Sequence, residues 1–410
     1  MNFEKFVAKR LHTEKNLQHS ISKPILKMAI AAVSLSITVM ILAIATGKGL
    51  QEKISAKVTG FTSDIQVAVL DLNASLEVAP ILADSLLLEA FYGIDGIVHI
   101  QTQITKNALI KTDTEFEGIV VKGVDENFDW SFINSHLIAG ESPRYTDSQK
   151  SNTIIISQKI SRKLSLGVQD EALFYFQGKK SHQPFVRKFT VAGIYETGIE
   201  LFDDLYVFAD QQHLRKMNRW SENQCSSIEL KVKEGFNRQQ VLLEVEQKSP
   251  FDTRVTSARD TYSQIFDWIK LFDMNIVIIL LIMILVACIN MISSLLIIIL
   301  ERTKMIGLMK ALGATQISIK KIFLYHAFYL LRKGLIIGNG IGLSLIGIQY
   351  YFAPIQLDPE HYYVKSLPVL LSPENWMLIN LFSIVICMCM LIIPSLMIQK
   401  VEPIKALRYE

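Results

Sequence analysis

Four long apolar runs stand out along a chain of 410 residues. They are Ile25–Thr46, Asn275–Leu300, Gly334–Phe352 and Trp376–Ile398. A helix needs roughly 20 apolar residues to cross the hydrocarbon core of a bilayer. Each run therefore predicts one membrane-spanning helix, one before and three after a long segment of mixed character.

The first run has a second interpretation, a cleaved signal peptide. Ala43, Ile44 and Ala45 resemble a small-residue cleavage site. The apolar core is longer than the about 7–15 residues of a signal peptide, and a long basic arm precedes it. We therefore favour an uncleaved anchor.

The segment Gly47–Asp273 alternates between strand and helix periodicity, which predicts a mixed α+β domain large enough to bury its own core. Predicted strands are Asp64–Leu70, Gly96–Thr105, Phe116–Val124, Asn152–Ser157, Leu173–Gln177, Phe185–Tyr195, Leu205–Ala209, Ser227–Lys233 and Thr253–Ser257. Predicted helices are Val78–Phe91, Gln158–Leu166, Gln211–Asn218 and Asn237–Gln247, and a helical pattern from Arg259 continues into the second apolar run. The fold class is thus a four-helix membrane protein with an α+β domain outside the cytoplasm.

Lysine and arginine gather in the N-terminal arm, in the loop after the second run and in the tail. The loop Ala353–Asn375 carries only Lys365 against Asp358, Glu360 and Glu374. Because positive loops stay in the cytoplasm, this bias places both termini and the middle loop there, and Gly47–Asp273 on the other side. The net charge of +3 is too small to indicate nucleic-acid binding.

The predicted organisation has nine parts. They are a cytoplasmic amphipathic arm lying on the membrane surface (1–23), spans at 24–46, 274–300, 334–352 and 376–398, an extracytoplasmic domain (47–273), a cytoplasmic coupling helix with an amphipathic lead-in (301–333), an extracytoplasmic loop (353–375) and a cytoplasmic tail (399–410). Gly334, Gly338, Gly342 and Gly347 predict close approach of another helix to the third span. Pro394 predicts a kink in the fourth.

The stretch Glu301–Tyr325 lies between two spans and has its own amphipathic pattern. Met305, Ile306, Leu308, Met309 and Leu312 recur at helical spacing among basic residues. Gly313 can end this helix and Thr315 can cap the next one. We predict a short surface helix through which a soluble partner could move the membrane segments.

Several kinds of enzyme are excluded because the chain lacks their sequence motifs. The chain lacks a phosphate-binding loop of the form G-x-x-x-x-G-K-[ST], and also H-E-x-x-H, G-x-S-x-G and paired C-x-x-C. The eight histidines are scattered, so we predict no metal site and no catalytic residue. Cys225 is the only cysteine in the α+β domain, which excludes a disulfide within it. Energy must therefore enter from a separate protein.

These residues resemble a known family. Glu301-Arg302-x-x-x-Ile306-Gly307-Leu308-x-Lys310-Ala311-Leu312-Gly313-Ala314-Thr315 is similar to the coupling segment of FtsX/MacB-type ABC transporter permeases. The ending Glu402-Pro403-Ile404-x-Ala406-Leu407-Arg408 is similar to that family's C-terminus. One span, a large exported domain and three further spans match its architecture.

Within the family, the chain most resembles the lipoprotein-releasing (LolC/LolE-type) permease subunits. The similar stretches are Gly49–Glu52, Gly60–Val67, Gly118–Asp125 and Phe189–Gly198 with Asp203–Asp204 behind it. The resemblance implies a permease of the bacterial inner membrane that binds no cofactor, while ATP and Mg²⁺ are held by a separate ABC ATPase. It also implies a second permease copy, alike or different, and contact with membrane lipid, a lipoprotein substrate and a periplasmic carrier.

The resemblance also implies roles for individual residues. Coupling to the ATPase would fall to Glu301, Arg302, Met305, Ile306, Gly307, Leu308, Lys310, Ala311, Leu312 and Gly313. A substrate cavity between two permeases would be lined by Met40, Ile44, Ile276, Ile279 and Met283, although the methionines also suit plain lipid-facing packing. A carrier-binding hairpin would include Lys179, Lys180, Pro184 and Phe185, with an ordinary solvated hairpin as the alternative.

Two other functions fit the same architecture. One is a MacB-like permease for efflux or peptide export with an outer-membrane channel. The other is a cell-division-type permease whose movement switches on a murein hydrolase. The exported segment Gly47–Asp273 is larger than that second type usually carries, so it is the weaker alternative.

Overall fold

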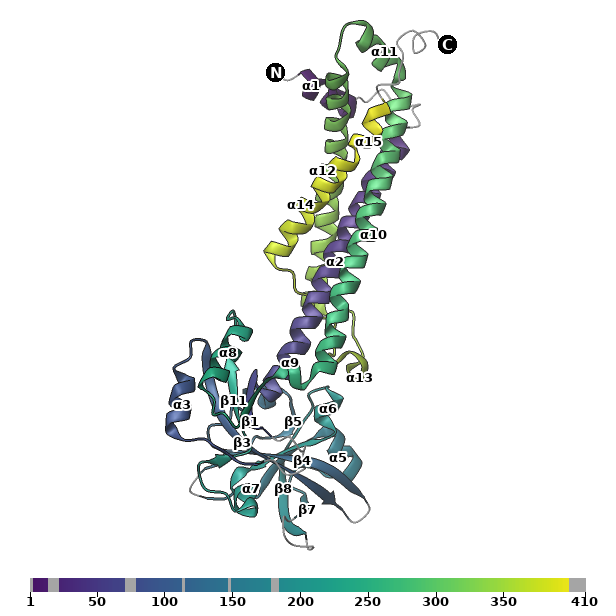
Figure 1. The fold of residues 1–410 in the computed structure, drawn as a ribbon. Helices are drawn as coiled ribbons and strands as arrows, with labels where there is room; N and C mark the ends of the chain where they lie inside the picture. Colours follow the sequence, from purple (N-terminus) through teal and green to yellow (C-terminus); the bar gives the residue numbers. More distant parts are fainter. Residues whose placement is uncertain are drawn as a thin grey trace. The chain divides into compact units, whose positions relative to one another are not determined.

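The computed structural model describes residues 3–13, 22–70, 79–112, 115–146, 149–177 and 184–397. The chain divides into two compact units (Figure 1). The helical unit comprises Met1–Glu52, Trp268–Gln356 and Ser366–Glu410, and the α/β unit comprises Lys53–Asp267 and Leu357–Lys365. Each unit is described by itself below.

The helical unit is built from seven helices in the described residues, two of which also contribute to the α/β unit. They are α1 (Phe3–Thr13), α2 (Ser22–Thr62), α10 (Ser263–Glu301), α11 (Thr303–Ala311), α12 (Gln316–Phe352), α14 (Pro373–Met390) and α15 (Ile392–Ser395). Four described helical stretches are long and apolar enough to cross a membrane: Pro24–Thr62, Ser263–Glu301, Gln316–Phe352 and Pro373–Ser395. The break at Leu391 agrees with the kink predicted near Pro394, because proline cannot donate the next helical hydrogen bond.

α2 is the central helix of this unit. Half of its apolar window is buried inside the chain, against 22% for each of the other three. It packs closely against α12, where a Cβ added to Gly334 would lie 2.6 Å from Val33 Cγ1 and one added to Gly338 would lie 2.6 Å from Ser34 O. Gly342 also faces α2, whereas no atom of the described residues lies within 4 Å of a Cβ at Gly347. The predicted close approach is thus confirmed at three glycines, while at Gly347 no helix of the described part of this chain makes it.

α1 packs against the first part of α12. Ser318 Oγ donates to Glu4 Oε1 at 2.8 Å, and the ammonium of Lys5 lies 5.6 Å from the ring centroid of Tyr325. Ala8 is fully buried. The predicted helix in the N-terminal arm is confirmed for residues 3–13, and it lies against a neighbouring helix of its own chain.

The α/β unit contains twelve strands and eight helices among its described residues, leaving aside the parts of α2 and α10 assigned to it. The strands are β1 (Ile65–Val69), β2 (Ile81–Leu82), β3 (Ile97–Lys111), β4 (Phe116–Val124), β5 (Leu137–Gly140), β6 (Thr153–Ser157), β7 (Glu171–Phe176), β8 (Phe185–Tyr195), β9 (Tyr206–Asp210), β10 (Gln224–Cys225), β11 (Ser227–Val232) and β12 (Thr253–Ser257). The helices are α3 (Ser85–Tyr92), α4 (Ser131–Ser135), α5 (Gln158–Leu164), α6 (Glu200–Asp203), α7 (Gln211–Asn218), α8 (Arg238–Lys248), α9 (Ala258–Thr261) and α13 (Pro359–Tyr362).

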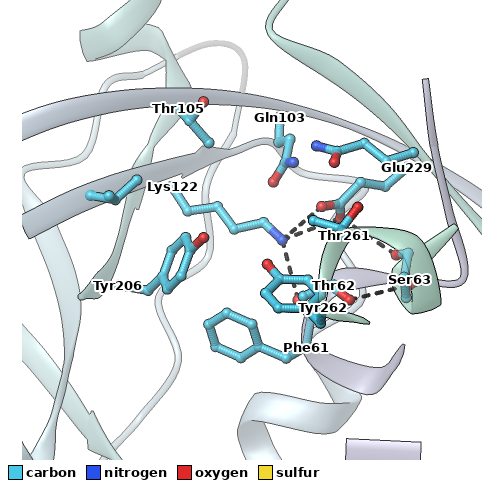
Figure 2. Close-up of a pocket in the computed structure, with 13 residues that line it drawn as sticks. Phe61, Thr62, Ser63, Gln103, Thr105, Lys122, Tyr206, Glu229, Thr261 and Tyr262 are labelled. Atoms are coloured by element: carbon cyan, nitrogen blue, oxygen red, sulfur yellow. Dashed lines mark hydrogen bonds and ion pairs between the residues drawn. The ribbon is translucent and has the colours of Figure 1, made fainter. Parts of the chain in front are cut away.

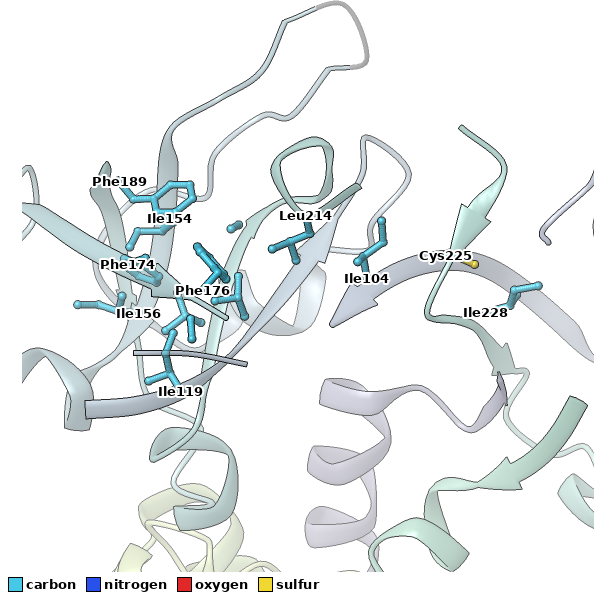
Figure 3. Packing of buried hydrophobic residues seen from close by; sticks show 14 of the residues in the cluster. Ile104, Ile119, Ile154, Ile156, Phe174, Phe176, Phe189, Leu214, Cys225 and Ile228 are labelled. Carbon is cyan, nitrogen blue, oxygen red and sulfur yellow. The ribbon is translucent and has the colours of Figure 1, made fainter. Parts of the chain in front are cut away.

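The long strand β3 joins two parts of one sheet. Its second half pairs with β4 on one side and β7 on the other, and the pairs β4·β9, β9·β6, β6·β8 and β8·β7 close a ring. Figure 3 shows Phe174, Phe176 and Phe189 gathered with Ile154 and Ile156 in the core of this ring. The first half of β3 pairs with β11, which continues through β1 to β12. A closed ring therefore shares one strand with an open sheet.

Most predicted strands and helices of this unit are confirmed within a few residues. One prediction is wrong: a helix over Val78–Phe91. The helix begins only at Ser85, where the Asp84 side chain accepts from Leu87 N at 2.8 Å, and Ile81–Leu82 instead pairs with β10. Pro80 disfavours helix at the residue before it, which explains the late start, and Val78 itself lies outside the described residues.

The segment Leu357–Lys365 belongs to the α/β unit although it lies between α12 and α14 in the sequence. Lys57 Nζ donates to Tyr363 O at 2.8 Å and to Thr197 O at 2.5 Å. Lys365 Nζ lies 2.8 Å from Glu196 Oε2. Desolvation by burial lowers the pKa of Lys57, and the nearby Asp203 carboxylate partly offsets this. One lysine thus joins α2 to two separate loops.

Candidate functional site

The connection between α10 and α12 folds as a short helix between two turns. α11 follows Arg302, whose backbone leaves the helical conformation, and ends at Ala311. Gly313 has φ = +88°, in the left-handed region that favours glycine. Ser318 N then donates to Thr315 Oγ1 at 3.3 Å and starts α12. The predicted helix end at Gly313 and cap at Thr315 are both confirmed.

α11 has one buried and one exposed side. Ile306 and Gly307 are buried against the core of the helical unit. Leu308 and Leu312 are 52% and 79% exposed, and Ile317 in the first turn of α12 is 67% exposed. We call Leu308, Leu312 and Ile317 the apolar tip. Large apolar side chains gathered at an exposed turn offer a surface for another protein.

The ten residues predicted for coupling differ in how far their side chains are exposed. Ile306 and Gly307 are buried, and Arg302, Met305 and Lys310 are half-buried. The exposed members are Glu301, Leu308, Ala311, Leu312 and Gly313. The exposed group is available for contact, whereas the buried group fixes α11 onto its own unit.

A second candidate site lies in the α/β unit, on the sheet face opposite the hydrophobic core. Because successive strand residues point to opposite faces, Ile228 and Leu230 of β11 enter the core while Ser227 and Glu229 face away from it. All four are buried. This opposite side, which we call the polar face, carries Gln66, Gln101, Gln103, Thr105, Lys122, Ser227 and Glu229.

The polar face contains a buried ion pair. Lys122 and Glu229 side chains are 3% and 2% exposed, and Lys122 Nζ lies 2.9 Å from Glu229 Oε1 and 3.3 Å from Oε2. Gln101 Nε2 donates to Glu229 Oε2 at 2.7 Å. Lys122 Nζ also donates to the carbonyl oxygen of Phe61, in the last turn of α2, at 3.2 Å. The hydrogen bonds to both charges offset the high cost of burying them.

A cavity of about 220 Å³ lies beside this ion pair (Figure 2). The rings of Phe61, Tyr206 and Tyr262 contribute to its lining, as does the side chain of Gln103. Burial raises the pKa of the Tyr206 and Tyr262 phenols, so both stay protonated at neutral pH. The site therefore combines paired charges, neutral hydrogen-bonding groups and aromatic walls.

The sequence prediction did not single out the polar face. Its only signal was the alternation of polar residues in β3 and β11, such as Gln101 and Gln103. Such alternation is usual for a strand with one solvated side. The last turn of α2, the helix α9 and the following residue Tyr262 supply lining residues on this side, and that long-range arrangement is not visible in local patterns.

Two family matches cover most of the chain. Residues 28–248 match the MacB-like periplasmic core domain, and residues 277–403 match the FtsX-like permease C-terminal domain. The chain belongs to the FtsX/MacB-type ABC transporter permeases. This permease thus combines four membrane-type helices, one before and three after, with an α/β domain.

Named relatives extend the likeness to nearly the full length of the permease. The lipoprotein-releasing system transmembrane protein LolC of Neisseria meningitidis is 21% identical over 400 residues, covering 93% of this chain and 94% of that protein. LolE of Haemophilus influenzae is 20% identical over 316 residues, covering 74% of this chain and 76% of that protein.

Two solved structures are also similar. The periplasmic region of MacB from Actinobacillus actinomycetemcomitans matches with 10% identity and a TM-score of 0.34, covering 50% of this chain and 92% of that one. The extracellular domain of YknZ, a noncanonic ABC-type transporter from Gram-positive bacteria, matches with 14% identity and a TM-score of 0.32, covering 47% and 98%.

The five residues predicted for a substrate cavity in the permease differ in their surroundings. Met40 and Ile276 are buried within the chain, at 1% and 8% exposure. Ile44 and Met283 are half-buried against the same helical core. Ile279 on α10 is 37% exposed. In a single chain, therefore, Ile279 is the member available to a ligand or to a second permease.

The predicted carrier hairpin of the permease is formed by β7 and β8, which pair up to Phe176 and Phe185. Lys179 and Lys180 lie outside the described residues, so only Pro184 and Phe185 of that prediction are placed. Phe185 is 38% exposed at the start of β8.

Proposed function

We propose that this permease is the membrane subunit of an ATP-driven complex that extracts lipoproteins from the bacterial inner membrane and passes them to a periplasmic carrier. The observation that carries the proposal is the likeness to the Neisseria LolC protein, which spans 93% of one chain and 94% of the other. A match of this extent includes the spans, the α/β domain and the coupling segment together. It therefore supports a common overall role better than a shared domain would.

In this proposal the permease does not hydrolyse ATP itself. A separate ABC ATPase binds ATP and Mg²⁺, and a second permease, identical or different, completes the membrane part. The basic N-terminal arm, the basic loop around α11 and the basic tail lie in the cytoplasm by the positive-inside rule. The α/β unit is then extracytoplasmic, where a carrier can reach it.

The apolar tip is the proposed docking surface for the ATPase. Leu308 and Leu312 are exposed, while Ile306 on the opposite side of α11 is fully buried in the helical unit. A force on the exposed side of α11 is therefore transmitted to the side chains packed around Ile306. Its direct effect falls on α10 and α12, the two helices that α11 connects.

Leu308→Glu tests this docking. The substitution removes a central apolar anchor and places a carboxylate in the contact, which costs desolvation free energy. We therefore expect the amount of ATPase retained to fall about 10- to 100-fold. The measurement is affinity purification of the full-length chain from detergent-solubilised membranes, with the ATPase quantified by mass spectrometry. Release of native-membrane lipoproteins in the presence of ATP should fall in parallel.

Leu86→Glu is the matched control, because Leu86 is 78% exposed on α3 of the α/β unit. It introduces the same charge on an exposed helix without touching α11. Equal ATPase recovery with Leu308→Glu and the unaltered chain would remove the docking claim. Met305→Glu is a poorer probe, because Met305 packs against the helical core and its loss would also disturb the fold.

A MacB-like export permease is the second candidate, favoured by the match of residues 28–248 to the MacB-like periplasmic core domain. A photo-crosslinker at the exposed Ile279 separates the two. Cross-linked lipoproteins would support lipoprotein extraction. Cross-linked peptides or small molecules, with an outer-membrane channel in the purified complex, would support export.

A further inference from the structure

The last turn of α2 accepts a hydrogen bond from a flexible side chain of the sheet, in addition to the stacking of Phe61 on Phe202. Carbonyl groups at a helix C-terminus lack intrahelical partners and carry partial negative charge. The Phe61 carbonyl is such a group, and Lys122 Nζ donates to it from β4 at 3.2 Å. The other two hydrogen bonds of this ammonium go to the two carboxylate oxygens of Glu229. Its three donors therefore all have acceptors.

Gln103 offers a fourth acceptor on the same face. Its Nε2 donates to Ser227 Oγ at 2.8 Å, and the residue is 3% exposed. Its Oε1 is buried with no hydrogen-bond partner among the residues that the structure describes. A buried carbonyl oxygen without a partner costs free energy, so such a group calls for an explanation.

The strand register puts Gln103 within reach of Lys122. Thr105 of β3 lies opposite Lys122 of β4, and Gln103 lies opposite Val124. Gln103 and Lys122 are therefore diagonal neighbours on one face, a spacing that long side chains can bridge. Figure 2 shows both side chains pointing into the same cavity, which has a volume of about 220 Å³. The lysine thus has room to move and a second acceptor to move to.

We propose that Lys122 is a positioning residue of the transport cycle: it holds the last turn of α2 through the Phe61 carbonyl, and releases that turn by moving its donor to Gln103 Oε1. The ion pair with Glu229 is kept in both arrangements, so no charge becomes unpaired. The exchange replaces one neutral acceptor by another, which keeps the two arrangements close in free energy. A contact of this kind can be made and broken at each cycle.

The proposal rests on the family, an ATP-driven permease, and not on lipoproteins as the substrate. The test is hydrogen–deuterium exchange of peptides covering residues 56–63 in the full-length chain bound to its co-purified ATPase, with and without ATP plus vanadate. In the unaltered complex we expect exchange in this turn to differ about tenfold between the two nucleotide states, because release exposes its terminal hydrogen bonds.

Two substitutions at one position are expected to act in opposite directions. Gln103→Leu removes the second acceptor, so the turn should stay held and exchange slowly in both states. Gln103→Glu supplies a charged and stronger acceptor, so the turn should be released and exchange fast in both states. Gln66→Leu is the matched control, because Gln66 lines the same cavity and donates to the same Ser227 Oγ at 2.9 Å. It should keep the state-dependent difference.

Three results would overturn the proposal: no nucleotide dependence in the unaltered complex, the same dependence in both Gln103 variants as in the unaltered complex, or its equal loss in Gln66→Leu. If Gln103→Leu does not fold, the Gln103→Glu variant alone tests the proposal. Only a change of acceptor by Lys122 predicts fast hydrogen–deuterium exchange in both nucleotide states together with unchanged ATPase recovery. Failure to find lipoprotein substrates would leave this experiment unaffected.

Discussion

The two ends of α2 are held in different ways. In the helical unit, its backbone lies directly against α12: an added Cβ on Gly338 would meet Ser34 O at 2.6 Å, and Thr38 Oγ1 donates to Gly338 O at 3.0 Å. In the α/β unit, the last turn is held by the Lys122 side chain and by stacking of Phe61 on Phe202, with ring centroids 4.3 Å apart.

The two contacts differ in how many packing or hydrogen-bond arrangements each of them allows. Backbones in close contact across small residues fit in one arrangement, because any shift creates overlap or a gap. A lysine ammonium on a flexible stem can keep its charge partner and still change one hydrogen bond. We infer that the first contact is fixed and that the second is adjustable.

The largest expected effect is that of removing one charge at the adjustable end. Lys122→Met leaves Glu229 buried without its counter-charge, which should destabilise the α/β unit by about 3–5 kcal/mol. The double variant Lys122→Met/Glu229→Gln removes both charges and should recover at least half of that loss. The measurement is the unfolding midpoint of the full-length chain in detergent, followed by a signal from the α/β unit.

A double variant no more stable than the single one would show that the lysine stabilises the fold chiefly through contacts other than its charge pair. In that case the Lys122 contact could not be called the adjustable anchor of this end of α2. The stacked ring of Phe61 would then be the main anchor.

A smaller loss is expected at the fixed end. Gly338→Ala forces its methyl group against the Ser34 carbonyl, so the helical unit should lose about 1–3 kcal/mol from overpacking. Gly347→Ala is the control, because in the part of the chain that the structure describes no atom lies within 4 Å of a Cβ there, and alanine favours helix. Equal unfolding midpoints for the two variants would contradict the tight contact.

The smallest effect is expected at a half-exposed ion pair near the polar face. Lys231 Nζ lies 2.7 Å from Asp129 Oδ2, with side chains 41% and 31% exposed. Burial works to raise the pKa of Asp129, but hydrogen bonds from Lys231 and Ser131 lower it to about 2. A lowered carboxyl pKa contributes stability above the unfolded value near 4, which is lost as pH falls from about 4 to about 2.

Solvent screening limits this contribution to about 1 kcal/mol or less. Asp129→Asn should therefore lower the midpoint slightly at pH 7 and flatten its decline between about pH 4 and pH 2. The same pH titration of unfolding on both chains is the check. A loss as large as that of Lys122→Met would mean that burial does not distinguish the two pairs.

Much of the fold was visible in local patterns. Apolar runs predicted the four long helices, and strand periodicity predicted β4, β8 and β9 with nearly correct ends. Gly313 and Thr315 were recognised because each acts through its own backbone or side chain within a few residues. The helix that ends before Gly313 could be predicted for the same reason.

The polar face could not be predicted, because its burial depends on segments far apart in the sequence. Gln103 and Glu229 look like solvated strand positions until Phe61 and Tyr262 are brought to the same place. The extension of β3 to Lys111 had the same origin, since its second half is stabilised by β7. Residue types alone likewise did not separate the exposed Leu308 from the buried Ile306.

The segment Leu357–Lys365 has a practical consequence for anyone isolating the α/β domain. A recombinant fragment cut as one continuous piece, residues 53–267, would omit this segment, and Lys57 and Glu196 would each lose a partner. Binding surfaces mapped on such a fragment would include a patch that the intact protein covers. Grafting residues 357–365 back through a designed linker would restore it.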